Sequence, residues 1–199
     1  MPAQPGQYHR ELISRLALQV HLVAEGIRDV FEGSAVEVAL MIEPALDGGA
    51  SDSRPTGTWC RQLLGMYRDW AENRHMQLSE IKIGGGADDL PILLVSGFGA
   101  ERVLKRECGL HVLELSGSDG SSRASARVRL AAAPLGEVPA ARLPRVLRDA
   151  FEKAQHPSAV VRRYRGEPSP LVRSADGSWR TGKLDAVLRG DFDLMAAEL

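Results

Sequence analysis

The 199-residue sequence lacks the features that define several specialised classes of protein. Its two cysteines, Cys60 and Cys108, have no Cys-x-x-Cys spacing and no cluster of histidines beside them, so neither a disulfide framework nor a zinc site is predicted. No apolar run approaches the roughly 20 residues that cross a bilayer, and the N-terminus has no secretory pattern. The remaining composition is ordinary for globular proteins, so we expect a folded cytoplasmic protein without a membrane partner.

A strong excess of charge of one sign is also missing, since the formal net charge is −1. The charge is nevertheless unevenly distributed, because residues 123–189 contain 14 Lys and Arg against 6 Asp and Glu. An arginine-rich segment can neutralise phosphates, although the chain as a whole does not have the balance of a dedicated nucleic-acid-binding protein. A solvated basic face is the simpler explanation of the pattern.

Hydrophobic periodicity predicts two long helices, at residues 8–32 and 58–76, each with apolar residues at steps of three and four. Runs of β-branched or alternating residues predict strands at 35–43, 76–83, 90–97, 110–115, 123–133 and 159–165. Shorter helices are predicted at 98–108 and 144–155, followed by two more near the C-terminus, the second starting near Asp191.

Strands joined by hairpins and mixed with helices predict an α+β fold. We expect a mixed, mostly antiparallel sheet with helices packed on it, preceded by an N-terminal amphipathic helix. The apolar stripe of that helix could dock on the protein's own core or on another subunit.

Residue chemistry predicts no active site. The glycine-rich segment 84–89 joins two predicted strands, so it cannot cradle a phosphate at a helix N-terminus. Cys108 and His111 could form a nucleophile pair, but three residues along a turn into a strand do not force the side chains together. A structural role in the core is the simpler expectation for His111. No metal, cofactor or small-molecule substrate is predicted.

Two segments of the sequence resemble the core domain of bacterial class I peptide chain release factors. Residues 63–83 and 92–115 contain the family's Met-Tyr-x-x-Trp-Ala-Glu helix, its Leu-Lys-x-Glu-x-Gly helix end and its Val-His strand opening. The matching residues include Met66, Tyr67, Trp70, Glu72, Lys105, Glu107 and His111. Residues 160–199 are similar to the family's C-terminal segment, with matches at Tyr164, Arg180, Leu184, Asp185, Gly190 and Asp193.

The resemblance implies an N-terminal helix at 1–33 and a release-factor-like core domain at 34–199. Within the core domain, the blocks 34–134 and 160–199 flank the short segment 135–159, at the place where the family carries its catalytic domain. That domain's Gly-Gly-Gln loop positions water against the peptidyl-tRNA ester, and no Gly-Gly-Gln occurs in this chain. We therefore expect a protein that is not an enzyme.

The segment that corresponds to the family's codon-reading loop is also altered. It consists of small and polar residues, namely Ser116, Gly117, Ser118, Asp119 and Gly120, followed by Ser121 and Ser122. Val112 and Glu114 replace basic residues that usually follow the strand histidine, and a carboxylate facing RNA repels phosphate. The resemblance thus implies a degenerate loop with a changed or lost decoding function.

Two functions from different classes are consistent with these observations. The chain could bind the ribosome without catalysis, in translation termination, rescue or regulation, through arginine contacts to ribosomal RNA phosphates. The candidate contact residues are Arg123, Arg127, Arg129, Arg162, Arg163 and Arg165. Alternatively, the release-factor fold could serve as a protein-interaction module or a subunit of a larger assembly, without RNA binding. Arginines that converge on one face would favour the first function, and arginines paired with carboxylates across strands would favour the second.

Overall fold

The computed structural model describes residues 5–45, 54–83, 90–117, 120–133, 138–154 and 157–193. The strands are β1 (Glu37–Pro44), β2 (Gln77–Ile81), β3 (Ile92–Ser96), β4 (Gly109–Gly117), β5 (Gly120–Ala132), β6 (Val160–Arg165), β7 (Leu171–Ser174) and β8 (Arg180–Thr181). The helices are α1 (Pro5–Glu32), α2 (Arg54–Asn73), α3 (Ala100–Lys105), α4 (Leu143–Lys153) and α5 (Leu184–Ala186), which continues into a kinked turn, η1 (Val187–Asp191).

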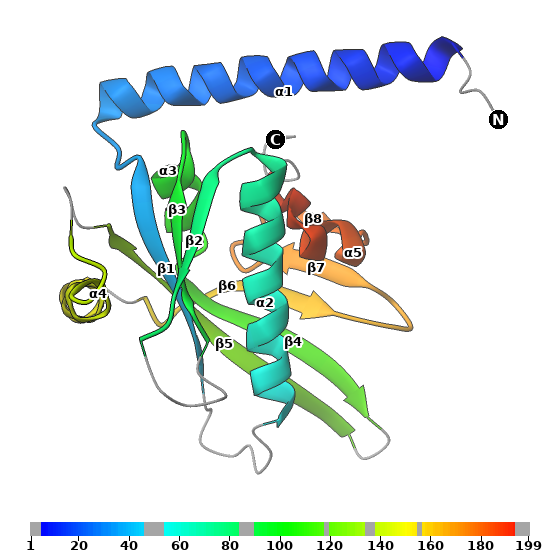
Figure 1. The fold of residues 1–199 in the computed structure, drawn as a ribbon. Coiled ribbons are helices and arrows are strands. Elements are labelled where there is room, and N and C mark those ends of the chain that lie inside the picture. The colour runs from blue at the N-terminus through cyan, green and yellow to red at the C-terminus, as the bar shows by residue number, and fades with distance from the viewer. Residues whose placement is uncertain are drawn as a thin grey trace.

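All eight strands form one sheet in the order β2-β3-β1-β5-β4-β6-β7-β8 (Figure 1). Neighbouring strands are antiparallel except β4 and β6, which run parallel. The predicted α+β class and the mostly antiparallel, mixed sheet are therefore confirmed. Both sequence blocks on either side of residues 135–159 contribute strands to this sheet.

One face of the sheet carries the main hydrophobic core, beneath α2 (Figure 1). Pro55 lies in the first turn of α2, where its missing N–H needs no partner. Trp59 of α2 donates its indole N–H to the backbone oxygen of His111 at 3.0 Å and packs edge-on against Tyr164 at 4.7 Å between ring centroids. Burial of each such large side chain contributes about 2 kcal/mol or more to stability. These contacts tie α2 to β4 and β6.

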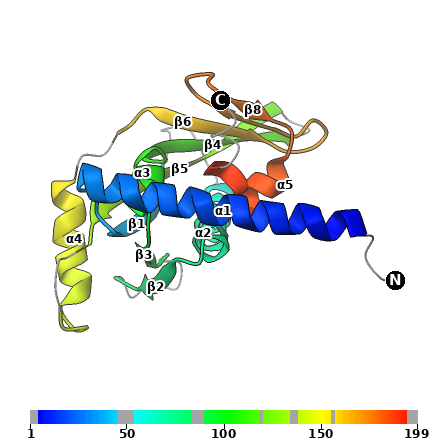
Figure 2. The ribbon, with the colours of Figure 1, turned by 90° about the horizontal axis from the view of Figure 1, so that it is seen from above.

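The opposite face is covered only in part. Leu147 and Phe151 of α4 pack against Ala39, Ile92 and Ala131, which belong to β1, β3 and β5. In the view from above, α1 and α2 lie on one side of β4, β6 and β7, and none of the described helices lies on the other side (Figure 2). The part of this face formed by β4, β6 and β7 is thus not covered by any described helix.

The C-terminal segment differs from the sequence prediction. Two short helices were expected there, and the structure has two strands before them, β7 and β8, that were not predicted; the helical segment that follows, α5 with η1, is divided in two by a kink at Arg189 and Gly190. Asp191 directly follows this kink and the helix continues through Phe192 and Asp193, so the predicted start of the second helix near Asp191 agrees with the structure. Short strands were missed because the sequence from 166 to 183 is dominated by turn-forming residues, and the hairpin is stabilised by pairing to β6.

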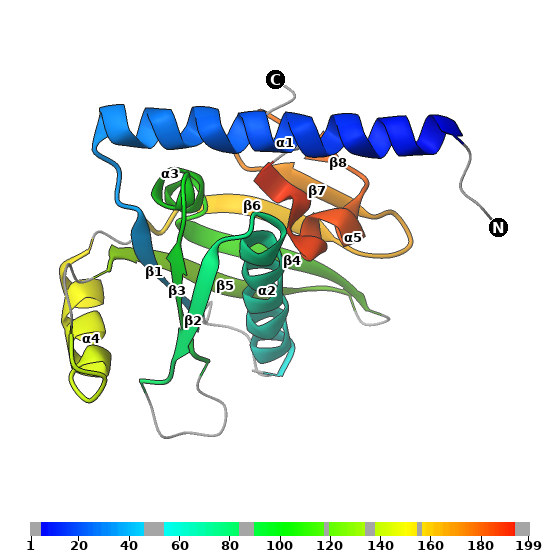
Figure 3. The same ribbon diagram turned by 45° about the horizontal axis from the view of Figure 1, so that its top comes forward.

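The helix α1 is attached to the rest of the fold by its C-terminal third. Arg102 of α3 pairs with Glu25 and with Asp29, the latter at 3.0 Å. Asp29 also accepts a hydrogen bond from the backbone N–H of Gly99, at the start of α3. The polar contacts of Glu25 and Asp29 and the packing of Phe98 over Gly26, not the apolar stripe, therefore hold α1 in place. The N-terminal end of α1 extends past the other described elements (Figure 3).

None of the helices in the described ranges is long and apolar enough to cross a membrane.

Candidate nucleic-acid interface

The open half of the sheet is lined by arginines. Because successive residues of a strand point to opposite faces, Arg123, Arg127 and Arg129 of β5 share one face. The register places Arg127 opposite Glu43 of β1 and opposite Leu110 of β4. Ala124, Ala126 and Val128 occupy the other face, in the core beneath α2. The three arginines therefore lie on the face that α2 does not cover.

The adjoining strands add further arginines to the same face. Arg163 of β6 lies beside Val112, which pairs with Ser125 of β5, and Arg165 lies beside Glu114, which pairs with Arg123. Arg163 also faces Arg173 of β7, and Arg173 faces Arg180 of β8. The whole set, which we call the basic sheet face, is Arg123, Arg127, Arg129, Arg163, Arg165, Arg173 and Arg180.

Two of these arginines were missed as contact candidates in the sequence. Arg173 and Arg180 lie in the β7–β8 hairpin, which the periodicity did not predict. The available signal was the number of residues that separates these two arginines from β6. It shows that they share a face with Arg163 only when the strand register is known.

Glutamates neutralise part of the basic sheet face. Glu43 forms an ion pair with Arg127 at 3.6 Å and accepts a hydrogen bond from Arg129 at 3.2 Å, and Glu114 forms an ion pair with Arg173 at 3.6 Å. Partly exposed pairs of this kind are worth about 1 kcal/mol or less. Across the part of the chain that the structure describes, no ion pair involves Arg123, Arg163 or Arg180. The arginines thus converge on one face and are also partly paired, and the positive charge exceeds the negative.

Arg129 also connects β5 to the helix α4. It donates to the backbone oxygen of Phe151 at 2.7 Å, and its guanidinium lies 5.7 Å from the centroid of the Phe151 ring. These contacts fasten the end of α4 to β5. Arg129 thus marks the border between the covered and the open parts of this face.

The inclusion of Arg162 among the RNA-contacting candidates is wrong. Arg162 points to the core face of β6, is 3 % exposed, and donates to Glu107 Oε1 at 2.5 Å. Its guanidinium packs against the rings of Trp179 and Phe192, at 4.9 and 5.3 Å from their centroids. Neighbouring strand residues face opposite ways, so Arg162 and Arg163 could not both belong to one surface.

Glu107 and His111, two residues of the release-factor-like motif, form a buried network with Arg162. Tyr67 of α2 donates to Glu107 Oε2 at 3.3 Å, while burial raises the pKa of Glu107 and Arg162 opposes that rise. The ring of His111 bridges the backbone oxygen of Glu107 at 2.9 Å and the hydroxyl of Tyr164 at 3.0 Å. Every member of this network is buried.

His111 is a neutral residue of the core. Burial, helped by the nearby Arg162 charge, lowers the pKa of His111 from 6.5 to about 3. The uncharged ring donates from Nε2 to Glu107 and accepts at Nδ1 from Tyr164, which occupies both nitrogens. Cys108 donates instead to the backbone oxygen of Leu104, and burial raises the pKa of its thiol to about 11. This arrangement does not activate a nucleophile.

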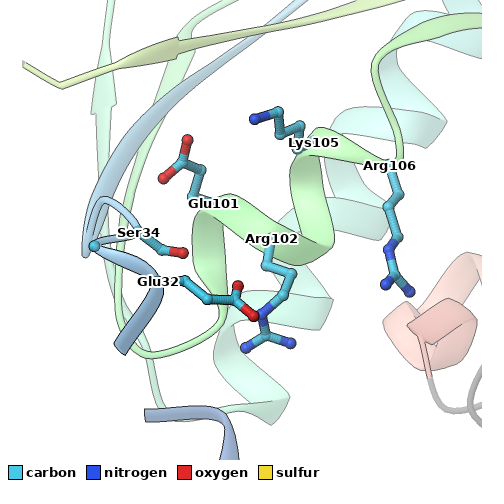
Figure 4. Close-up of a pocket in the computed structure, with 7 residues that line it drawn as sticks. Glu32, Ser34, Glu101, Arg102, Lys105 and Arg106 are labelled. Atoms are coloured by element: carbon cyan, nitrogen blue, oxygen red, sulfur yellow. The ribbon is translucent and has the colours of Figure 1, made fainter. Parts of the chain in front are cut away.

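The other motif residues divide between core and surface. Met66 is fully buried, and Trp70 donates its indole N–H to Asp193 Oδ2 at 2.9 Å. Glu72 and Lys105 are exposed. Lys105 lines an open depression of about 410 Å³ between α1 and α3, beside Arg102, Arg106, Glu32 and Glu101 (Figure 4). Acidic and basic side chains are mixed there, so the depression has no single charge for a ligand to complement.

The degenerate loop is shorter than the predicted turn at 116–122. Ser116 pairs with Ser121 and Gly117 with Gly120, so β4 and β5 continue almost to the end of the hairpin. Ser118 and Asp119 lie outside the described residues. Because the backbone supplies the hydrogen bonds of a ladder, small residues of low strand propensity can extend the two strands. Glu114 lies at the base of this hairpin on the basic sheet face.

Among the residues that the structure places, no group of three His, Cys, Asp or Glu side chains could hold a metal ion.

Comparison with known proteins gives a structural match but no match by sequence. No protein-family model matches the chain, and no curated protein matches it. Among solved structures, RF2 of Thermus thermophilus matches with a TM-score of 0.59 over 99 % of this chain and 77 % of that chain, at 15 % sequence identity. The chain has a release-factor-like fold. At this identity the match establishes the architecture, while function must be argued from the side chains of this chain.

Proposed function

We propose that this protein is a non-hydrolytic, release-factor-like factor that binds ribosomal RNA through the basic sheet face. The observation that carries the proposal is the alignment of seven arginines from β5, β6, β7 and β8 on one open side of the sheet. Guanidinium groups pair with phosphates in a fixed, planar geometry, and several in a row fit a phosphate backbone. The release-factor-like fold supports a role in translation.

Binding through this face would position the protein without reading a base sequence. Contacts from arginines to phosphates set affinity and orientation, whereas sequence is read at base edges. Glu43 and Glu114 each hold neighbouring arginines, which keeps the guanidinium groups ordered before binding. The same two carboxylates weaken the field, so the proposed affinity is moderate and falls with added salt.

The proposal includes the absence of peptidyl-tRNA hydrolysis. The segment between β5 and β6 contains the helix α4, and the chain contains no Gly-Gly-Gln sequence. His111 and Cys108 are engaged in core contacts and supply no alternative base or nucleophile. We expect no release of peptide from ribosomes at any codon.

The decisive experiment is co-sedimentation with purified ribosomes at about 50 and about 200 mM salt. The test variant is Arg123→Glu/Arg163→Glu, because both side chains lie on the basic sheet face and neither forms an ion pair among the described residues. Arg129 is left unchanged because it fastens α4. We expect saturable binding of the native chain, weaker binding at the higher salt, and a loss of about tenfold or more in the variant.

The matched control is Arg61→Glu/Arg106→Glu, which makes the same change of net charge at exposed positions of α2 and the end of α3. These residues lie on the other side of the molecule from the basic sheet face. Equal losses in the two double variants would show a general charge effect and overturn the proposed interface. No binding of the native chain at the lower salt would overturn ribosome binding itself.

A protein-interaction module without RNA binding is the second candidate function. The observation that favours it is the exposed apolar stripe of α1, which no described part of the chain covers. If ribosomes fail to bind the native chain, this function becomes the better explanation of the fold.

A further inference from the structure

The apolar stripe of α1 faces away from the protein's own sheet. Among the α1 residues whose side chains the structure describes, Glu25, Gly26 and Asp29 are buried, and Glu25 and Asp29 pair with Arg102 of α3. The stripe consists of Leu12, Ile13, Leu16, Val20, Val23, Ile27, Val30 and Phe31, all of which are more than half exposed. Soluble monomers rarely expose so large a contiguous apolar surface, so a partner must cover it.

The spacing of the stripe identifies the shape of that partner. Residues Ile13, Leu16, Val20, Val23, Ile27 and Val30 alternate in steps of three and four without interruption. These are the a and d positions of a heptad repeat, the pattern by which two helices wind around each other. The a positions, Ile13, Val20 and Ile27, are all β-branched, as is typical of parallel two-stranded coiled coils. Of the d positions, residue 16 is the leucine that such coils favour, and residues 23 and 30 are valines. The stripe therefore fits another helix running in the same direction.

We propose that α1 forms a parallel, in-register coiled coil with α1 of a second copy of this chain, making the protein a dimer. Eight half-exposed apolar side chains offer on the order of 800 Å² per chain, the area that a stable interface buries on each partner. A closed two-fold arrangement of identical surfaces is the commonest form of oligomer.

The residues that flank the stripe permit self-pairing. The positions next to the seam are Ala17, Gln19, Ala24 and Gly26, which carry no charge, so two identical helices meet without like-charge repulsion. The charged residues in the C-terminal third of α1, Glu25, Arg28, Asp29 and Glu32, occupy none of the seam positions or the positions next to them, and Arg102 pairs with Glu25 and Asp29 on the side that faces α3. The bodies of the two copies would therefore lie on the outer sides of the helix pair.

A parallel register also gives a partner to the two most exposed aromatic side chains. Phe31 is 87 % exposed, at a position beside the seam, and Phe98 is 53 % exposed. In each chain Phe98 packs over Gly26, where an added Cβ would lie 2.9 Å from the ring. In a parallel pair, a residue at the position of Gly26 faces the residue five places later in the other helix, which is Phe31. Phe31 of each copy would thus pack against Phe98 of the other.

Sedimentation equilibrium of the full chain between about 1 and 200 µM tests the proposal. We expect the mass of two chains for the native protein and of one chain for Val20→Lys/Ile27→Lys, because lysines at two seam positions are desolvated on pairing. The control is His21→Lys, which together with the native Arg28 places two cations at the same spacing but away from the seam, at b positions of the heptad. This control should remain dimeric.

An engineered cysteine tests the direction of the helices. Val20→Cys should form a disulfide-linked dimer on mild oxidation, because the same residue of both copies meets at the seam only in a parallel, in-register pair. His21→Cys should not. A native chain that stays monomeric over the whole concentration range overturns the proposal and assigns the stripe to a different protein. A dimer that Val20→Lys/Ile27→Lys leaves intact, or a mass of three chains, overturns it equally.

Discussion

Gly190 packs directly against the backbone of Trp70: a Cβ atom added at Gly190 would lie 2.6 Å from Trp70 Cα. The same glycine adopts φ +95°, in the region that side chains disfavour. This contact seats the kinked C-terminal turn on α2, where Trp70 and Arg74 both bind the carboxylate of Asp193.

Replacing Gly190 with alanine should therefore destabilise the protein. The added methyl group cannot fit without moving backbone, and the positive φ adds strain, so we expect a loss of roughly 3 kcal/mol in the free energy of unfolding. Urea denaturation measures it. Gly182→Ala is the control, because a Cβ there meets only the oxygen of Pro170 at 3.6 Å. Equal stability of the two variants would contradict the proposed contact.

Removing the positive charge of Arg162 should leave a buried carboxylate without its partner. Arg162→Met is expected to reduce the free energy of unfolding by about 3–5 kcal/mol at pH 8. Burial already raises the pKa of Glu107, and loss of the opposing Arg162 charge raises it further. The folded variant then retains a proton on Glu107 at higher pH than the unfolded chain does, so its stability falls as pH rises. A smaller loss at pH 5 than at pH 8, measured by urea denaturation, is the expected signature. A loss that does not depend on pH would argue against this coupling.

Protonation of His111 should oppose folding in mildly acidic solution. The pKa of His111 is about 3 in the folded chain and 6.5 in the ordinary state, so the unfolded chain binds the extra proton between these values. Stability from this group is complete above pH 6.5 and is lost as pH falls towards 3. Between pH 7 and pH 5 the loss amounts to about 2 kcal/mol. His111→Gln lacks this titration, and its unfolding free energy should fall less over the same interval. Parallel pH profiles for the two proteins would refute a neutral, buried His111.

Loss of Arg102 should loosen α1 without unfolding the sheet. Arg102→Met leaves the buried Asp29 without its cation and leaves the buried Glu25 with only its pair to Arg28. We expect hydrogen exchange in the C-terminal third of α1 to accelerate by at least about tenfold, while β4 and β5 keep their protection. Arg28→Gln, which removes only the pair between the exposed Arg28 side chain and Glu25 and leaves Arg102 in place, should leave the exchange rates unchanged. Uniform acceleration throughout the chain would show that Arg102 stabilises the whole fold.

The sequence carried enough information to predict the strands from β1 to β6 and the two long helices. Their hydrophobic patterns are periodic, and these elements occur in the structure in the predicted order along the chain. The hairpin of β7 and β8 was missed because strands of four and two residues have too few positions to show a period. Their formation depends on the edge that β6 provides.

The candidate site was only partly predictable. Alternation along β5 correctly placed Arg127 and Arg129 on one face, but the sequence could not show whether Arg162 or Arg163 would join them. That choice is decided by Glu107, which lies far away in the sequence and draws Arg162 into the core. The sequence also could not show which surface the apolar stripe of α1 contacts. An apolar stripe has the same spacing whether it packs on its own chain or on another one.

The parallel pairing of β4 with β6 makes the junction between β5 and β6 a natural insertion point. The end of β5 and the start of β6 both lie beside the start of β4, because Gly109 pairs with Val128 and Leu110 pairs with Val160. The segment that connects β5 to β6 therefore begins and ends at the same place. Its length has little effect on the sheet, because loop-closure entropy grows only slowly with length. This fold can accommodate a bridge of one helix or an entire additional domain at residues 133–159, and the same junction offers protein engineers a site at which to graft a new one.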